Sequence, residues 1–237
     1  MAFEDILRGS FGKVLTETSF VKRSYNTLKD HGFTDDNSIA SVCVCRDEIS
    51  QPIRSAIRST WGEAFNLSSL GAMFTAGKTG LRAAMNHSPQ VEGKERYIFY
   101  ILPHIAIDEQ GTAGSYRRRG SRLSSACGAL CQFLAELRER RVRILMDEED
   151  VEESLLKRRL VREIPWGEIP ELIPLTEIAR RVSQSDLEHA LYKVVDFATS
   201  DTAVLTGIQI HGPESNYVAP RESYLILNGQ RQELRLV

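Results

Sequence analysis

Two apolar runs separated by a helical pattern constrain the fold of this chain most strongly. Residues 38–45 are apolar and β-branched and end in charged residues, which predicts a strand buried on both faces. Residues 96–107 form a second such run, rich in aromatic and β-branched side chains and broken by Pro103. Between them, apolar side chains recur at helical spacing over 53–65, which predicts a helix with one apolar face. We therefore expect an α/β domain with a central β-sheet flanked by helices.

Patterns elsewhere add helices around this sheet and a hairpin at its end. Asn228-Gly229 after a short apolar run predicts the turn of a C-terminal β-hairpin. Residues 111–120, which contain glycine and several arginines, are typical of a loop. The other expected elements are helices at 3–28, 124–141, 148–163 and 176–197, the last with a second cap near Ser185, and strands at 142–146, 204–211 and 224–227.

Charge and hydropathy exclude two broad classes of partner. The formal net charge of -2 leaves no excess positive charge for a phosphate backbone, which disfavours nucleic acid. No apolar run reaches the roughly 18 residues that a membrane-spanning helix needs. Residues 1–13 lack the pattern of a secretory signal, although a transit peptide already removed would leave no trace. We therefore expect a soluble protein.

Four cysteines, Cys43, Cys45, Cys127 and Cys131, occur as two close pairs in a chain of 237 residues. Disulfide scaffolds are shorter and denser in cysteine, and a redox protein favours a Cys-x-x-Cys spacing that neither pair has. Thiolate sulfur and imidazole nitrogen are ligands of zinc, and a catalytic zinc has three protein ligands and one position for water. His104 stands at a predicted strand end, as Cys45 does, where ligands gather in open α/β sheets.

The spacing leaves several arrangements of these cysteines open. Side chains two apart on a strand lie about 7 Å from each other, whereas two thiolates on one zinc approach within about 4 Å. Cys43 and Cys45 are therefore not expected to share an ion, and Cys45, at the strand end, is the freer of the two. Cys127 and Cys131 are one helical turn apart and are compatible with half of a four-cysteine structural site. Alternatively, all four cysteines are simply buried.

Five segments together carry a family resemblance. They are NSIASVCVCRDE at 37–48, WGEAFNL at 61–67, AGKTG at 76–80, LPHIAID at 102–108 and SACGAL at 125–130. In these segments the chain resembles the limiting-CO2-inducible protein B family of algae, diatoms and bacteria, strongly over 37–130 and more loosely elsewhere. That family is similar to a divergent, theta-type branch of the β-type carbonic anhydrases. The resemblance thus implies a β-carbonic-anhydrase-like α/β fold that carries zinc.

The resemblance also implies an activity and a set of ligands. The implied cofactor is Zn²⁺, and Cys45, His104 and Cys127 map onto the family's ligands. The implied enzyme is a carbonic anhydrase, a lyase that reversibly hydrates carbon dioxide to bicarbonate with hydroxide that zinc provides at neutral pH. The alternative is a catalytically inactive member that keeps zinc and acts as a scaffold or partner in inorganic-carbon trapping.

Asp47 is the implied catalytic carboxylate. Cys45 and Asp47 match the first two fixed positions of the β-type motif Cys-x-Asp-x-Arg, but Ile49 occupies the arginine position. We expect Arg54 or Arg46 to supply the arginine that holds Asp47 away from the metal. Held in this way, Asp47 would orient the bound water; released, it would bind zinc as a fourth ligand. The alternative is that Asp47 only caps the helix that follows.

Organisation and location follow from the same resemblance. We expect residues 1–237 to form a single zinc-binding domain, with the N-terminal segment 1–36 packing on it or on a partner subunit. The family implies a homodimer or higher oligomer, carbon dioxide or bicarbonate as the small-molecule partner, and a place in a carbon dioxide concentrating mechanism. It implies the plastid, in the stroma or pyrenoid region, for an alga or diatom, and the cytoplasm for a bacterium.

The other histidines and one lysine carry weaker signals. His87 is either a proton shuttle or an exposed loop histidine, and His211 receives no role, nor do the remaining two. Lys78 lies in a segment similar to a phosphate loop, but Ala72 stands where that motif needs its first glycine. We therefore do not expect a nucleotide.

Overall fold

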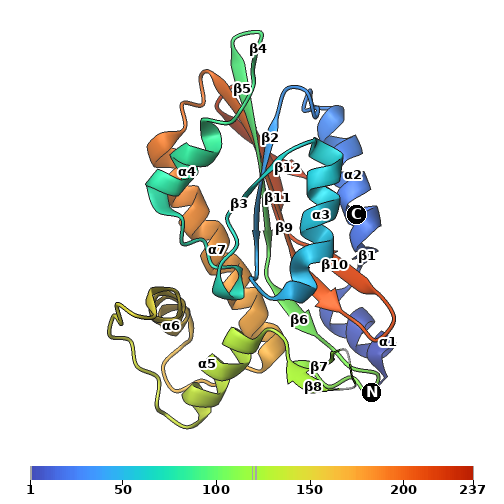
Figure 1. Cartoon of the computed structure of the whole chain (residues 1–237), viewed down its shortest axis with the longest axis vertical. Helices are drawn as coiled ribbons and strands as arrows, with labels where there is room; N and C mark the ends of the chain where they lie inside the picture. Colours follow the sequence, from blue (N-terminus) through green and yellow to red (C-terminus); the bar gives the residue numbers. More distant parts are fainter. Residues whose placement is uncertain (1, 119, 121, 237) are drawn as a thin grey trace.

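The computed structural model describes residues 2–118, 120 and 122–236, and it contains a mixed sheet with helices on both faces (Figure 1). The strand order is β1-β10-β9-β5-β2-β3. Strands β3, β2, β5 and β9 run parallel to one another, β10 is antiparallel to β9, and β1 is antiparallel to β10. These strands are β1 (Leu15–Thr16), β2 (Ile39–Val44), β3 (Ala64–Asn66), β5 (Lys94–Leu102), β9 (Ser200–His211) and β10 (Asn216–Pro220).

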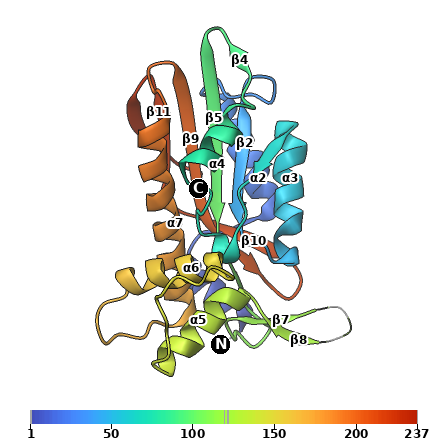
Figure 2. The same ribbon diagram turned by 60° about the vertical axis from the view of Figure 1, so that its left-hand side comes forward.

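Shorter strands extend this sheet at both ends. β6 (His104–Ala106) continues beyond β5 and pairs with β9, and β4 (Gln90–Val91) pairs back onto β5. β11 (Ser223–Leu227) pairs with β9 and forms the C-terminal hairpin with β12 (Gln230–Leu234). A separate hairpin of β7 (Ser115–Arg117) and β8 (Leu123–Ser125) extends away from the body of the molecule (Figure 2).

The helices form two layers and a cap at one end of the sheet (Figures 1 and 2). α2 (Glu17–Lys29) and α3 (Gln51–Trp61) cover one face, and α4 (Gly77–Met85) and α7 (Leu172–Val194) cover the other. α5 (Gly128–Arg138) and α6 (Val151–Glu163) lie at the end where β2 and β5 finish. α1 (Phe3–Ile6) and the π-helical turn Leu7–Phe11 lie near that end too.

The central strands are hydrophobic along their whole length because both faces are covered. Every residue of β2 and of β9 is buried, as expected for parallel strands between two helical layers. Ile53, Ile57 and Trp61 of α3 pack on one face, and Leu81 and Leu187 of α4 and α7 pack on the other. Trp61 also donates a 2.9 Å hydrogen bond from Nε1 to the Tyr100 hydroxyl of β5. These residues belong to two separate apolar cores, one on each face of the sheet.

A third core lies at the α5 and α6 end of the sheet and contains the N-terminal segment. Phe3 and Phe11 pack there with Ile105, Leu130 and residues of α7. Phe3 and Phe11 therefore contribute to the core at this end of the sheet.

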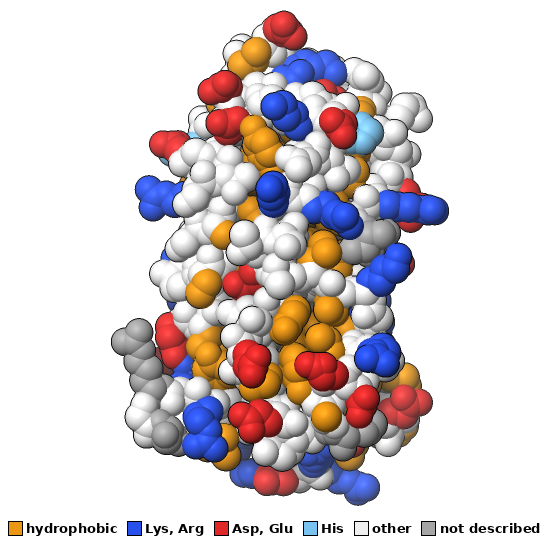
Figure 3. All heavy atoms as spheres, turned by 90° about the vertical axis from the view of Figure 1, so that its right-hand side faces the viewer, with side chains coloured by type: hydrophobic (Ala, Val, Ile, Leu, Met, Phe, Trp, Pro, Cys, Tyr) orange, Lys and Arg blue, Asp and Glu red, His pale blue; other side chains and the backbone are white. Residues whose placement is uncertain are grey.

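Figure 3 shows the face of the molecule that lies on the right in Figure 1. Acidic and basic side chains are interspersed over it, and hydrophobic side chains gather in its lower half. Neither sign of charge dominates this face, in keeping with the net charge of -2. Among the described residues, no helix has the length and apolar character needed to cross a bilayer.

The α/β prediction and the C-terminal hairpin are confirmed, and three local predictions are wrong. Residues 142–146 are not a strand: they are irregular, and Leu145 is 82% exposed, so their apolar side chains have no sheet to cover. α7 runs through Ser185 without a second cap. The expected loop at 111–120 contains β7, while Arg119 lies outside the described residues.

Candidate metal centre

Three side chains distant in sequence converge where the parallel strands end. Cys45 follows β2, His104 begins β6, and Cys127 immediately precedes α5. Their ligand atoms all lie within 4.8 Å of one another, and the two Sγ atoms are 3.6 Å apart. The three residues are 5%, 0% and 1% exposed, so the cluster is inside the protein.

The sheet register explains this convergence. β2 and β5 are parallel and in register up to the pair Val44 and Leu102, so the residues after both strands emerge at one edge. Pro103 follows the last residue of β5 and ends that strand. Its carbonyl accepts a 2.9 Å hydrogen bond from the backbone N–H of Gln209 in β9, and the chain continues from there as β6. The backbone of Cys45 is held by an isolated parallel β-bridge to Ser69.

The two sulfurs differ in their preference for the thiolate. A hydrogen bond from Cys127 and the neighbouring His104 lower the pKa of Cys45 to about 4, against the effect of burial. The Cys45 sulfur and burial raise the pKa of Cys127, although the amides of Leu130 and Ala129 at the start of α5 act in the opposite direction. The two pKa values shift in opposite directions, so the thiolate is favoured on Cys45 over Cys127, and a cation between the sulfurs would favour the thiolate form of both.

The donor set fits zinc. The Nε2 atom of His104 is buried and has no hydrogen-bond partner, which leaves its lone pair available. Two Zn–S bonds of about 2.3 Å at a tetrahedral angle span about 3.8 Å, close to the observed 3.6 Å between Cys45 and Cys127. Two sulfurs and one imidazole nitrogen are a known donor set of catalytic zinc.

The other two cysteines lie outside this cluster. The Cys43 thiol donates a 3.3 Å hydrogen bond to the Ala72 carbonyl, and burial raises its pKa to about 12. Cys131 is half-buried on the next turn of α5. Over the part of the chain that the structure describes, the compact group of possible ligands contains Cys45, His104 and Cys127. A four-cysteine site is therefore wrong for this arrangement.

Asp47 stands beside the cluster and is held by an arginine from the β7–β8 hairpin. Arg118 Nη2 donates to both carboxylate oxygens of Asp47, at 3.0 and 3.1 Å, and Arg118 Nε donates to Ser124 Oγ at 2.7 Å. Arg118 also forms an ion pair with Glu48. Asp47 Oδ2 is 4.0 Å from His104 Nε2, and Asp47 is not part of the compact ligand group. The arrangement keeps the carboxylate adjacent to the cluster rather than within it.

The prediction that Arg54 or Arg46 holds Asp47 is wrong. Arg46 points to α6, where its Nη2 is 2.6 Å from Glu152 Oε1, and Arg54 lies on α3. The partner is Arg118 because the chain after β6 folds into a hairpin that returns to the loop after β2. Asp47 also accepts a 3.4 Å hydrogen bond from the Ile49 amide, so it caps the following turn as well.

A second histidine supports His104 and was missed in the sequence. His211 Nε2 is 3.1 Å from His104 Nδ1, and His211 Nδ1 is 3.0 Å from Asn216 Oδ1. Burial, with a smaller contribution from His104, lowers the pKa of His211 to about 3, so its ring is neutral. The sequence signal was present, since His211 ends a predicted strand, as His104 was expected to do.

His87 lies at the wrong end of the sheet for a proton shuttle. Its ring lies tilted against that of Phe65, with centroids 5.7 Å apart, and both residues line a pocket with Ile39, at the start of β2. Cys45 follows the other end of that strand, about 20 Å away at 3.3 Å per residue. The shuttle interpretation is therefore wrong.

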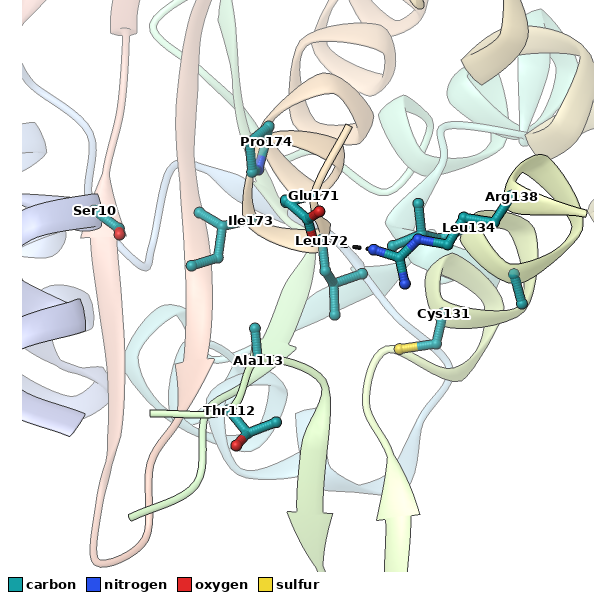
Figure 4. A pocket seen from close by; sticks show the side chains of 11 residues that line it. Ser10, Thr112, Ala113, Cys131, Leu134, Arg138, Glu171, Leu172, Ile173 and Pro174 are labelled. Carbon is teal, nitrogen blue, oxygen red and sulfur yellow. Dashed lines mark hydrogen bonds and ion pairs between the residues drawn. The ribbon is translucent and has the colours of Figure 1, made fainter. Parts of the chain in front are cut away.

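A cavity of about 680 Å³ lies nearby but has a different character (Figure 4). Cys131, Leu134 and Leu172 are among its lining residues, and Arg138 and Glu171 form a 3.0 Å ion pair at its edge. None of the three clustered ligands lines it. It is an apolar hollow between α5 and the start of α7.

Comparison with known proteins gives a family match over most of the chain. Residues 14–227 match the family described as limiting CO2-inducible proteins B/C, beta carbonic anhydrases. The crystal structure of limiting CO2-inducible protein LCIB is 32% identical, with a TM-score of 0.81 and 98% of each chain covered. That of PtLCIB4, a homologue of LCIB, is 20% identical, with a TM-score of 0.82 and 97% of this chain and 98% of that chain covered. A search of curated proteins finds no match.

Proposed function

Because the chain belongs to the family of limiting CO2-inducible proteins B/C, beta carbonic anhydrases, we propose that it is a zinc-dependent carbonic anhydrase that reversibly hydrates carbon dioxide to bicarbonate. The observation that carries this proposal is the convergence of two sulfurs and one unpartnered imidazole nitrogen next to a carboxylate that an arginine restrains. Three ligands leave a fourth position for water, as in catalytic zinc sites.

Each residue of the site has a defined task in this proposal. Zinc, when bound by Cys45, His104 and Cys127, supplies a Lewis acid that makes water a nucleophile near neutral pH. Asp47 accepts a hydrogen bond from the attacking water and so orients one lone pair of its oxygen toward carbon dioxide. Arg118 neutralises Asp47 and keeps it from taking the position that water needs.

The surroundings suit a small apolar substrate. Met73, Ile105 and Leu130 belong to the same buried cluster as Cys45 and Cys127. Carbon dioxide has no charge and needs no ion pair to bind, so apolar walls suffice. In the reaction, water and carbon dioxide give bicarbonate and one proton, and the proton leaves to solvent. The side chains of Asp47 and Arg118, 12% and 25% exposed, mark the side nearest solvent.

The second candidate function is a zinc-binding member that lacks activity and acts as a scaffold or partner in inorganic-carbon trapping. The observation that favours it is the near-complete burial of the three ligands. Metal analysis of the purified chain together with a stopped-flow assay of carbon dioxide hydration separates the two. Stoichiometric zinc with turnover supports the enzyme. Stoichiometric zinc without turnover supports the scaffold, and a chain that takes up no zinc contradicts both.

We also propose that residues 1–237 form one zinc-binding domain that assembles as a homodimer or higher oligomer. The family match and the N-terminal packing of Phe3 and Phe11 support the single domain. Light scattering after size-exclusion chromatography measures the oligomer directly. The plastid or cytoplasmic location and the part in a carbon dioxide concentrating mechanism remain proposals that depend on the source of the chain.

A further inference from the structure

We propose that His211 and Asn216 form a positioning relay that fixes the ring of His104 as the tautomer with its proton on Nδ1, so that Nε2 presents a lone pair to a divalent cation. The relay rests on the proposed function only in taking His104 as a ligand. His211 and Asn216 do not approach the metal themselves in this proposal. They act through His104.

Sheet register brings the members of the relay together. His104 of β6 pairs with Gln209 of β9, and His211 is two residues further along β9 on the same face. Asn216 of β10 is paired directly opposite His211. The side chains therefore form a row across three neighbouring strands. Tertiary pairing, rather than a flexible loop, sets the contacts of 3.1 Å and 3.0 Å.

Glu17, at the far end of this row, determines which atoms donate and which accept its hydrogen bonds. Its carboxylate, at the start of α2, accepts a hydrogen bond from the side chain of Asn216 and another, at 2.5 Å, from Gln209 Nε2. Only the amide nitrogen of Asn216 can donate to a carboxylate, so its Oδ1 is the atom that faces His211. That oxygen can only accept.

The remaining hydrogen bonds follow one by one. A neutral imidazole has one N–H and one lone pair. Because Asn216 Oδ1 accepts, His211 Nδ1 must carry the proton, and His211 Nε2 must accept. His104 Nδ1 therefore donates to His211, and His104 Nε2 has the lone pair. Nε2 is the buried atom without a partner, and a ring nitrogen of His104 lies within 4.8 Å of both sulfurs.

The opposite direction is costly. Reversing the relay turns the Asn216 oxygen toward the Glu17 carboxylate, which places two acceptors against each other. It also places a proton on His104 Nε2 inside the cluster, where it competes with the cation. A buried acceptor that faces another acceptor loses its hydrogen bond and is destabilising, so the observed direction is favoured.

The first test reads the tautomer without any metal. In the metal-free chain, nitrogen-15 NMR of the histidine rings is expected to show a neutral His211 ring that is protonated on Nδ1, toward Asn216, and unprotonated on Nε2, toward His104. Protonation of His211 on Nε2 instead of Nδ1 would overturn the relay. This readout does not depend on zinc binding or on activity, so it stands even if the proposed enzyme proves inactive.

The second test compares two substitutions of His211 by competitive titration of Zn²⁺ against a chromophoric chelator. His211→Leu removes the acceptor for His104, and we expect zinc affinity to fall about 10–100-fold. His211→Gln has an amide oxygen to accept from His104 and an amide nitrogen to donate to Asn216, so it should recover most of the affinity. Packing alone would not separate Leu from Gln in this order.

The outcomes separate the relay from the proposed function. Zinc binding by His211→Leu as tight as in wild type would refute the relay and leave the enzyme proposal standing. A wild-type chain that binds no zinc would refute the enzyme proposal, and the tautomer measurement would still decide the relay. Thermal unfolding of each variant identifies one that does not fold, in which case the wild-type NMR result decides.

Discussion

The two sides of the candidate centre are built differently. On the sheet side, Cys45, His104 and His211 lie on or directly after strands and are almost completely buried. On the hairpin side, the side chains of Asp47 and Arg118 are 12% and 25% exposed, and Arg118 comes from a hairpin that extends from the body (Figure 2). The buried side has the donor atoms to hold a cation, and the partly exposed side has the charged groups to orient water. Substitutions on the two sides should therefore separate metal binding from turnover.

The largest effect is expected from the sheet side. Cys45→Ser removes one of two thiolates, and we expect the loss of stoichiometric zinc, measured by elemental analysis after dialysis. Cys43→Ser is the matched control on the same strand, because a serine hydroxyl can still donate to the Ala72 carbonyl. Equal loss of zinc in both variants would contradict the assignment of the ligands.

A smaller effect, and of a different kind, is expected from the hairpin side. Arg118→Leu frees Asp47, and we expect kcat for carbon dioxide hydration to fall about 10²-fold, with zinc content unchanged. Arg138→Leu is the control, since this arginine is also exposed and paired with a glutamate but lies on α5 beside the apolar hollow. Loss of zinc from Arg118→Leu would show that the two sides do not act separately.

Metal removal tests whether the sheet side depends on the cation for its fold. The two cores on the faces of the sheet do not include the cluster, so the chain should stay folded after chelation. We expect an unchanged far-ultraviolet circular dichroism spectrum and a Tm lower by about 10 °C, from the lost binding free energy. Complete unfolding on chelation would mean that the centre supports the whole fold.

The smallest effect concerns Glu17, at the far end of the relay. Burial raises its pKa, while hydrogen bonds from Gln209 and Asn216 act against that rise. A carboxyl with a higher pKa in the folded chain binds more protons there, so its contribution to stability is present at pH below 4.5, its ordinary value, and is lost as pH rises through the folded-state pKa.

Replacement of this carboxyl makes the effect measurable. We expect the free energy of unfolding of metal-free Glu17→Gln to increase relative to wild type as pH rises from 4 toward 7. Urea unfolding of both proteins across this range gives the difference. A difference that stays constant with pH would contradict a raised pKa for Glu17.

Sequence patterns predicted the sheet side well for physical reasons. Because β2 and most of β5 are buried on both faces, their sequences are continuous apolar runs. Pro103 indicates where the second run is interrupted, directly before His104. Cys45 could be preferred over Cys43 because it stands at the strand end. These features are local, and local patterns are visible in one sequence.

The hairpin side could not be predicted in the same way. Arg118 meets Asp47 across 71 residues, through a short hairpin whose strands carry little apolar alternation. The relay depends on the register between β9 and β10, and β10 was not predicted at all. Residues 142–146 show the reverse error, since an apolar run there has no neighbouring strand to cover it. Contacts set by tertiary pairing leave no periodic signal along the chain.

X-ray absorption at the zinc edge of the loaded protein tests the central claim most directly. We expect a shell of two sulfurs at about 2.3 Å, with one imidazole nitrogen and one further light atom at about 2.0–2.1 Å. A shell of four sulfurs, or a shell with no sulfur, would contradict the assignment of Cys45, His104 and Cys127 as the ligands.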